Sequence, residues 1–343
     1  MSDDVDARIA RVRAVVDAAR TLAPDASLVD PIARSTGLSR EGVGLALRSH
    51  LETDPSDEDL RSLVSRMQVA LHVHVILSSN VFTASLRAVA CASAASASVS
   101  VQTSSREPHF ANALLRAIAN PAIFKADRDY VTSMSTGEIH VYGRGETIDA
   151  IEKLAPPGIV IRAHGPGFGV ACVVPGDQLE LAASNMANDV VPFDQRGCLS
   201  PRVAFVVGDS DRARAFADRL AVVLERMGSS VPRGTLDDDE KADAARYVDT
   251  MRFAGHVAVG ATCTVGLSES FTIPPSGRHV HVMPLGAPTE LTRVIAPVSH
   301  LVTAVGASDR TLASFFPDFV RYSKLGVMQK PPLDGPVDLR ALR

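Results

Sequence analysis

The chain has 343 residues, of which 46% are hydrophobic and 22% charged, an ordinary balance for a globular protein. At roughly 150 residues per domain, this length predicts about two domains or one large α/β unit. The formal net charge of −4, from 35 basic and 39 acidic side chains, gives no electrostatic support for binding nucleic acid or an anionic membrane.

The cysteines and the N-terminal sequence indicate the compartment. The four cysteines lie far apart without a Cys-x-x-Cys pair, which argues against a disulfide framework or a zinc ribbon. The start, "MSDDVDARIARVRAVV", is charged and lacks the apolar region of a signal peptide. No apolar run approaches the ~20 residues of a membrane span, and no HExxH or Cys/His set predicts a metal. We therefore expect a cytoplasmic protein without a membrane span or a metal.

Residues 1–66 are expected to form a helical N-terminal segment. "ARIARVRAVVDAARTL" places its apolar side chains on one stripe. "LVDPIARSTGLSREGVGLALRSHL" predicts two short helices around a glycine turn, a pattern that also resembles a DNA-binding helix-turn-helix. The acidic balance and the scarcity of basic residues favour a helical lead-in to the main domain instead.

Strands and helices alternate from about residue 67. The strand "LHVHVILSSN" precedes a helix and a second strand, "ASVSVQTSS". After a further helix, "EIHVYGRGET" and "GIVIRAHGPGFG" read as strands that end in glycine-rich turns. This order predicts a mostly parallel sheet covered on both faces, with ligands bound at the carboxyl ends of its strands. We assign residues 67–169 to this first α/β domain.

A second α/β domain is expected over residues 170–310. It begins with the strand "VACVVP" and the helix "DQLELAASNMANDVV", and it continues through the strand "RVAFVV" into a long amphipathic helix. Three more strands are predicted in "HVAVGATC", "RHVHVMPL" and "SHLVTAVG". The proline-rich residues 311–343 are expected to lie extended and to pack back on the first domain.

Cys198 is the candidate nucleophile. It lies in a polar, glycine-flanked loop, "FDQRGCLSP", just before the apolar strand "RVAFVV". Gly197 lets the backbone approach a substrate closely. A thiol of ordinary pKa is only about 3% ionised at pH 7, so a reactive cysteine needs a base or nearby donors. From these residues alone, a buried loop cysteine without function remains the other interpretation.

Two further residues suit such chemistry. His164 opens "HGPGFG" at the end of a predicted strand, and its imidazole is a candidate general base. Asn80 follows the first strand, where its amide could donate a hydrogen bond to a developing oxyanion. Each alone is equally compatible with a structural role, His164 at a strand end and Asn80 in a turn.

Signals for a cofactor are weaker. "YGRGET" places Gly143 and Gly145 between a strand and a helix, where backbone N–H groups can meet a phosphate. The motif is not a complete GxGxxG, and there is no Walker motif, so a P-loop hydrolase is not supported.

In this order, the segments resemble the aldehyde dehydrogenase superfamily, and more specifically the long-chain acyl-thioester (acyl-CoA) reductases related to the bacterial luminescence fatty-acid reductase. "FDQRGCLSPRVAFV" is the most specific match, because it is similar to the family's nucleophile segment. "HVILSSNVF", "VYGRGETIDAI", "IRAHGPGFGVACV" and "PSGRHVHVMPL" are similar to other family segments, and the matches run from about residue 70 to 335.

The resemblance implies a Rossmann-like NAD(P) domain and an α/β catalytic domain. It implies that Cys198 forms an acyl-enzyme from an acyl-CoA or acyl-carrier-protein thioester and that a nicotinamide hydride reduces it to an aldehyde. Asn80 and the backbone N–H of Cys198 would form the oxyanion hole. The cofactor, NADPH with NADH as the alternative, would contact five residues: Gln102, Ser104, Gly143, Gly145 and Gly165.

The chain departs from the superfamily pattern at two positions. Hydrolytic members carry a glutamate base in a Glu-Leu-Gly-Gly pattern, where this sequence reads Arg-Ala-His-Gly and ends in His164 and Gly165. The missing base fits thioester reduction, in which water is not the acyl acceptor. Gln102 replaces the lysine that helps to hold the adenosine ribose or its phosphate, so the choice between NADPH and NADH stays open.

Two other functions stay in view. One is a thiol-dependent dehydrogenase of the same superfamily that acts on a different activated acyl group. The other is a degenerate paralogue that binds nucleotide without chemistry, which Gln102 supports and the intact Gly-Cys-Leu-Ser-Pro loop opposes. A homo-oligomer is compatible with the sequence, and neither the acyl chain length nor the acyl carrier can be read from it.

Overall fold

The structure, a computed structural model, describes residues 4–342. The chain forms two compact units, and each is discontinuous in sequence. Unit 1 comprises the chain up to Thr36, Ala46–Pro166 and the residues from Pro332 onward, and unit 2 comprises Gly37–Leu45 and Gly167–Pro331. Within residues 4–342, no helix is long and apolar enough to cross a membrane.

Unit 1 contains a five-stranded sheet in the order β3-β2-β1-β4-β5, and every neighbouring pair is parallel. The strands are β1 (Val73–Ile76), β2 (Val99–Gln102), β3 (Ile123–Lys125), β4 (Glu138–Tyr142) and β5 (Val160–His164). The strand order reverses between β1 and β4, the kind of position at which open parallel sheets bind ligands. The predicted parallel sheet is confirmed, although the short strand β3 was not predicted.

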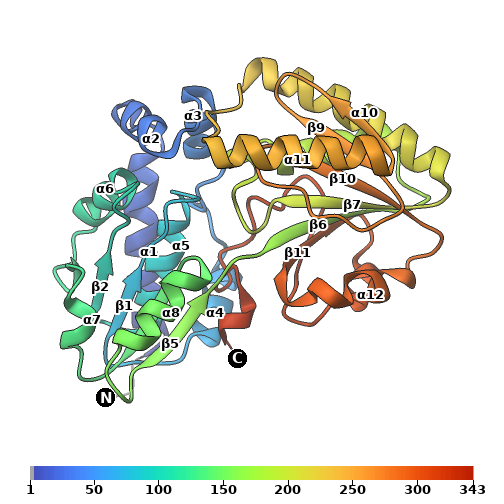
Figure 1. Ribbon diagram of the computed structural model, residues 1–343. Coiled ribbons are helices and arrows are strands. Elements are labelled where there is room, and N and C mark those ends of the chain that lie inside the picture. The colour runs from blue at the N-terminus through green and yellow to red at the C-terminus, as the bar shows by residue number, and fades with distance from the viewer. Residues whose placement is uncertain (1–3, 343) are drawn as a thin grey trace. The chain divides into compact units, whose positions relative to one another are not determined.

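The helices of unit 1 cover both faces of its sheet. They are α1 (Val5–Leu22), α2 (Val29–Thr36), α4 (Asp57–Arg66), α5 (Ala84–Ala95), α6 (His109–Ala117), α7 (Tyr130–Ser133) and α8 (Gly145–Leu154). Nearly every residue of the Ala/Ser-rich α5 is buried, because its small side chains let α1 pack on one side while β1 and β2 lie on the other. Helix α8 packs on β4 and closes an apolar cluster on the second face (Figure 1).

The predicted helical N-terminal region is confirmed, and most of it belongs to unit 1. Helices α1 and α4 pack on α5 and so belong to the same unit as the first sheet. Helix α3 (Arg40–Ser49) begins in unit 2 and ends in unit 1. The C-terminal segment Pro332–Leu342 also belongs to unit 1, where the buried guanidinium of Arg87 donates hydrogen bonds to Gly335 O (2.5 Å) and Pro332 O (2.9 Å).

Unit 2 contains a seven-stranded sheet in the order β12-β11-β6-β7-β10-β9-β8. Its strands are β6 (Phe168–Val173), β7 (Pro201–Val207), β8 (His256–Val259), β9 (Thr264–Leu267), β10 (His279–Leu285), β11 (Val302–Ala307) and β12 (Arg321–Ser323). All neighbours are parallel except the hairpin β8–β9. The strand predicted in "HVAVGATC" is confirmed as β8, which ends at Val259, and the chain then turns into β9, a strand that was not predicted.

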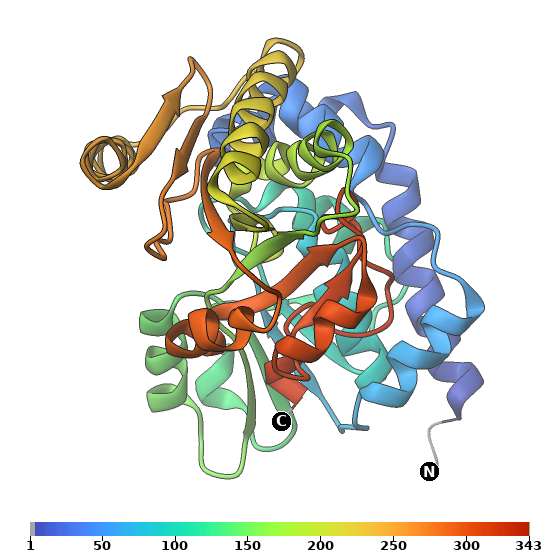
Figure 2. The same cartoon turned by 90° about the vertical axis from the view of Figure 1, so that its right-hand side faces the viewer.

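Two apolar cores flank this second sheet. Helices α9 (Leu179–Val190) and α10 (Ser210–Ser230) lie side by side on one face, and α12 (Glu290–Ile295) packs on the other (Figure 2). The acidic-capped helix α11 (Asp238–Ala254) packs on β8 and β9. Strand β12 pairs with β11, so residues 311–331 stay in unit 2 and only the residues after 331 lie on unit 1, a shorter segment than the predicted 311–343.

Buried histidines lie on strands of both sheets. His74 on β1 hydrogen-bonds Ser100 Oγ through Nδ1 (2.8 Å), and His281 on β10 contacts Ser270 O through Nε2 (2.9 Å). Burial lowers the pKa of His74, His279 and His281 to about 4 in each case. These rings are therefore neutral in the folded protein near neutral pH.

We predict that the free energy of unfolding decreases as the pH is lowered from 6.5 to 4. An unfolded histidine binds a proton near pH 6.5, whereas the three buried rings do not until about pH 4, so the unfolded chain takes up more protons in this window. Each such histidine contributes a slope of about 1.4 kcal/mol per pH unit to the free energy of unfolding. Urea unfolding at pH 7, 6 and 5 measures this slope, and His281→Gln should reduce it. Equal stability at pH 7 and 5 would contradict the prediction.

Candidate active site

All five predicted cofactor residues and Asn80 lie at, or just after, the carboxyl ends of the parallel strands in unit 1. Asn80 follows β1, Gln102 ends β2, and Ser104 lies two residues further on. Gly143 and Gly145 follow β4, and Gly165 follows β5. Because these four strands are adjacent and parallel, their following loops share one edge of the sheet.

The loop after β2 offers polar groups at this edge. Gln102 lies beside the ring of His74, and its Oε1 is buried without a well-formed hydrogen bond among residues 4–342. Ser104 Oγ accepts from the backbone N–H of Arg106 (3.2 Å), and the exposed Arg128 donates to Ser105 Oγ (3.4 Å). The end of β2 and the loop after it therefore combine a buried amide oxygen beside His74 with two exposed cations.

The turn after β4 presents backbone donors. Gly143 N–H donates to His164 O (3.2 Å), which ties the ends of β4 and β5 together. Helix α8 starts at Gly145, where a Cβ would have open space around it, and the residue before it, Arg144, makes no side-chain cap. The first N–H groups of α8 are thus left for water or an anionic ligand.

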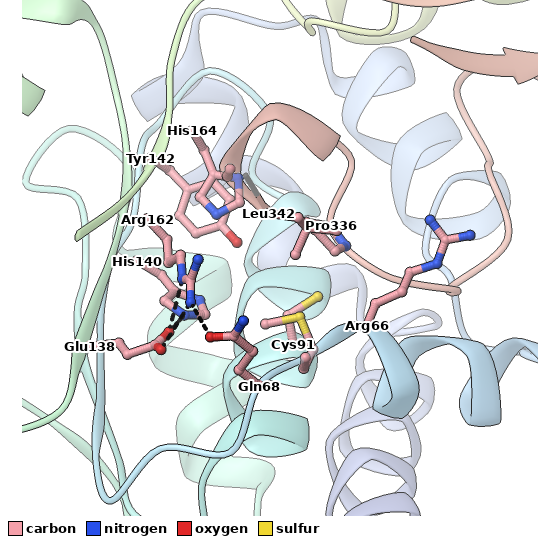
Figure 3. Close-up of a pocket in the computed structure, with 12 residues that line it drawn as sticks. Arg66, Gln68, Cys91, Glu138, His140, Tyr142, Arg162, His164, Pro336 and Leu342 are labelled. Atoms are coloured by element: carbon pink, nitrogen blue, oxygen red, sulfur yellow. Dashed lines mark hydrogen bonds and ion pairs between the residues drawn. The ribbon is translucent and has the colours of Figure 1, made fainter. Parts of the chain in front are cut away.

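His164 lies in a polar pocket of unit 1 (Figure 3). Its ring stacks on Tyr142, with centroids 4.1 Å apart and planes at 4°. Burial, followed by the nearby His140, lowers the pKa of His164 well below its ordinary value. The buried Nδ1 of His164 has no hydrogen-bond partner among residues 4–342. The structure thus assigns a neutral ring to this position.

The neighbours of His164 are groups that sequence reasoning missed. Glu138 accepts from Arg162 Nε (3.2 Å) and pairs with His140 Nε2 (3.3 Å), while Arg162 also donates to Gln68 Oε1 (2.8 Å). Burial opposes ionisation of Glu138, yet hydrogen bonds from His140 and Arg162 lower its pKa to about 2. The sequence did contain a signal for this cluster. Polar residues alternate with apolar ones in "EIHVY" and "RAH", and alternate residues of a strand share one face of the sheet, so on neighbouring strands these polar side chains lie close together.

In unit 2, Cys198 lies in the turn between the short 3₁₀ helix η2 (Pro192–Gln195) and β7. Among the four cysteines, all within the described residues, it is the only one that is not buried. Its carbonyl oxygen accepts a hydrogen bond from the buried hydroxyl of Thr303 on β11. Ser200 N–H donates to Gly197 O (3.1 Å), which closes the turn around the thiol.

Gly169 on β6 supports this turn from beneath. Its N–H donates to Ser200 O (2.9 Å), and a Cβ at this position would lie 2.4 Å from Leu199 O. The Cys198 turn therefore rests directly on the backbone of β6, which only glycine permits. Neither Gly169 nor Thr303 was singled out from the sequence, because their contacts depend on strand neighbours far away in the chain.

The residues leading into the turn have an unusual backbone. Phe193, Asp194 and Gln195 all have positive φ angles, of 55°, 49° and 64°. Each such conformation costs roughly 1–2 kcal/mol for a residue with a side chain, so contacts elsewhere must hold the segment in place.

We predict that Gly169→Ala destabilises unit 2 and displaces the Cys198 turn. The added methyl group would overlap Leu199 O, and relieving that overlap should lower the free energy of unfolding by about 1–3 kcal/mol. Urea unfolding measures the loss. Gly176→Ala, in the loop after β6, is the matched control, since no atom lies within 4 Å of its added Cβ. Equal stability of the two variants would refute the close approach.

Comparison with known proteins agrees with this architecture. The acyl-CoA reductase (LuxC) family matches residues 45–307. The long-chain acyl-protein thioester reductase of Aliivibrio fischeri is 28% identical over 203 residues, covering 53% of this chain and 42% of that protein. The long-chain acyl-protein thioester reductase 2 of Photobacterium leiognathi is 29% identical over 110 residues, covering 32% of this chain and 23% of that protein. The chain thus aligns with less than half the length of either relative.

Solved structures share the fold. A NAD-dependent benzaldehyde dehydrogenase from Corynebacterium glutamicum superposes with a TM-score of 0.69 at 15% identity, covering 95% of this chain and 80% of that one. A propionaldehyde dehydrogenase from Clostridium phytofermentans gives a TM-score of 0.65 at 10% identity, covering 97% and 84%. The expected aldehyde dehydrogenase-like fold is confirmed, and with more than half of its length matched, the chain belongs to the acyl-CoA reductase (LuxC) family.

Proposed function

We propose that this protein reduces an acyl thioester, carried on coenzyme A or on a protein, to an aldehyde, with Cys198 as the nucleophile. The observation that carries the proposal is the presentation of Cys198. It is the one cysteine that is not buried, and it lies in a turn fixed by Gly169 and Thr303 just before β7, a central strand of the unit 2 sheet. Membership of the family supplies the reaction class.

The proposed chemistry forms one carbon–sulfur bond and breaks two. The Cys198 thiolate attacks the thioester carbonyl, a new C–S bond forms, and the carrier thiolate leaves. Addition of a hydride to the acyl carbon gives a thiohemiacetal alkoxide, whose collapse releases the aldehyde and restores the Cys198 thiolate. A nicotinamide cofactor, when bound, supplies that hydride.

Asn80 and His164 are the other proposed catalytic residues. The Asn80 amide would donate to the alkoxide together with the backbone N–H of Cys198, a contribution worth about 3 kcal/mol in comparable oxyanion holes. His164 is the proposed general base for the proton that Cys198 must lose, a role that requires the neutral ring which burial favours.

The edge of the unit 1 sheet suits a nicotinamide dinucleotide. Gln102 Oε1 is a buried acceptor available to a ribose hydroxyl, and the start of α8 offers N–H groups to a pyrophosphate. We favour NADPH over NADH because of the loop after β2. Its carboxylate, Glu107, is turned away to accept from His109 N (2.8 Å) and Phe110 N (3.1 Å), which leaves Arg106 and Arg128 to receive a 2′-phosphate.

We predict that Cys198→Ala abolishes the reduction of acyl-CoA substrates while the protein stays folded. The assay follows the decrease in nicotinamide absorbance that accompanies reduction.

Asn80→Ala should lower kcat by about 100-fold through loss of one oxyanion donor. His164→Ala should remove the acidic limb of the pH–rate profile, because the base would be missing.

Cys263→Ala is the control for the nucleophile, since Cys263 is buried and burial raises the pKa of its thiol to about 12. Activity that survives in Cys198→Ala would refute the mechanism. An unchanged pH–rate profile in His164→Ala would remove that residue from proton transfer. Nucleotide binding without turnover of any thioester would favour a non-catalytic nucleotide-binding protein.

We predict that Arg128→Ala raises KM for NADPH at least fivefold and leaves KM for NADH within twofold, since only NADPH carries the 2′-phosphate. Steady-state kinetics with each cofactor measures both values. Arg116→Ala, in the last turn of α6, removes an equal charge from the same unit and serves as the control. Equal effects on the two cofactors would contradict the assignment of Arg128.

A further inference from the structure

The turn that presents Cys198 is preceded by three residues in the left-handed region of backbone space. Phe193, Asp194 and Gln195 all carry side chains, and such residues adopt this conformation rarely and singly. Three in succession would relax to an ordinary backbone if nothing held them. The contacts of these residues therefore determine where the chain enters the Cys198 turn.

Asp194 is held through both its carboxylate and its main chain. Its carboxylate is buried at 1% exposure; Oδ1 accepts from Nε and Nη2 of Arg278 (2.8 Å each), and Oδ2 accepts from Gly234 N (2.9 Å). Its backbone carbonyl accepts from Gly277 N (2.9 Å). The residue is thus bonded to two segments that are distant in sequence.

Arg278 is as constrained as its partner. It is 1% exposed, has a φ of 66°, and directly precedes β10. Its Nη1 donates to Val231 O (2.8 Å), and its Nη2 also lies near Pro232 O (3.4 Å). A guanidinium can serve these divergent acceptors together, whereas a single ammonium cannot.

Gln195 closes the segment from the other side. Its Nε2 donates to Pro201 O (2.8 Å) and His279 O (2.9 Å), and its Oε1 accepts from His279 N (2.9 Å). Pro201 begins β7, immediately beyond the Cys198 turn. The amide therefore ties the entrance of the turn to its exit and both to β10.

We propose that Asp194 and Arg278 are positioning residues for Cys198: their buried ion pair holds residues 193–195 in the left-handed conformation and so fixes the turn that presents the thiol. The inference deepens the proposed function, because it takes Cys198 as the nucleophile. It concerns placement of the thiol, since neither side chain is assigned a contact with the reacting atoms.

Stability alone is a poor explanation of this pair. Two charges lose their hydration at 1% exposure, and buried ion pairs are often no more stabilising than apolar residues of similar size. What the pair does provide is a unique geometry, in which one carboxylate joins three separate segments next to a strained turn. A role in placement predicts a loss of turnover that exceeds any loss of substrate binding.

The test compares Asp194→Asn, Arg278→Met and the double variant in the full chain. Asp194→Asn should lower kcat for acyl-CoA reduction at least tenfold and change KM less than threefold.

The rate at which iodoacetamide alkylates Cys198, read from its peptide by mass spectrometry, should rise at least threefold in Asp194→Asn because the released turn exposes the thiol. Alkylation is measured at pH 9, where ordinary thiols are largely ionised, so the rate reports access. The double variant should be no worse than either single variant, within threefold.

Arg278→Lys keeps the charge but replaces the several divergent donors of the guanidinium with a single ammonium. It should lower kcat and raise the alkylation rate of Cys198, each by at least twofold. Glu52→Gln is the matched control, because it breaks a partly buried ion pair with Arg87 in unit 1 (2.8 Å) and should leave both rates unchanged.

Wild-type kcat and alkylation in folded Asp194→Asn and Arg278→Lys, with only a lower melting temperature, would overturn the proposal. So would kcat and alkylation falling together, since that pattern means lost thiol reactivity. Reductase activity surviving in Cys198→Ala would refute the proposed function separately, while the alkylation rates would still decide whether the pair positions the turn.

Discussion

A strained backbone segment, Phe193–Gln195, is the constraint on which the organisation of unit 2 around Cys198 depends. Chain in this conformation persists only where other contacts over-determine it. Here those contacts come from three directions: the start of β10, the loop after α10, and the beginning of β7. From below, β6 supplies a glycine backbone on which the turn rests. The proposed nucleophile thus lies on a turn whose conformation is fixed by contacts with the sheet.

Unit 1 shows a different way to build a site from a sheet. Its edge gathers short loops from four parallel strands, and each contributes a polar atom or a glycine. Little in these loops is strained; their positions follow from strand order alone. We propose a long, polar ligand held at several points of this edge, and a single reacting carbonyl at the Cys198 turn. The division of labour matches the proposed two-substrate chemistry.

The sequence was informative where function depends on local pattern. The Gly-Cys-Leu-Ser-Pro loop, the glycine turn after β4 and the alternation of strands and helices could all be read directly, because each is set by neighbouring residues. Gly169, Thr303 and Arg278 could not, since their importance arises from strands that meet only in the folded sheet. His164 was noticed for its chemistry, but its stacking on Tyr142 and its polar surroundings require the pairing of β4 with β5. Short or hairpin strands such as β3, β9 and β12 have too little periodicity to stand out.

The path of the chain has a consequence for the order in which the protein assembles during synthesis. The polypeptide leaves unit 1, builds nearly all of unit 2, and returns only after Pro331. Arg87, buried in α5, donates hydrogen bonds to the carbonyls of Pro332 and Gly335, which follow unit 2 in the sequence. Glu52, also in unit 1, pairs with this guanidinium, but two of its acceptors come from the far side of unit 2 in the chain, so unit 1 is completed only after the segment that forms unit 2. Unit 2, whose main segment Gly167–Pro331 is continuous, needs no residue after Pro331 and can therefore fold before unit 1 is complete.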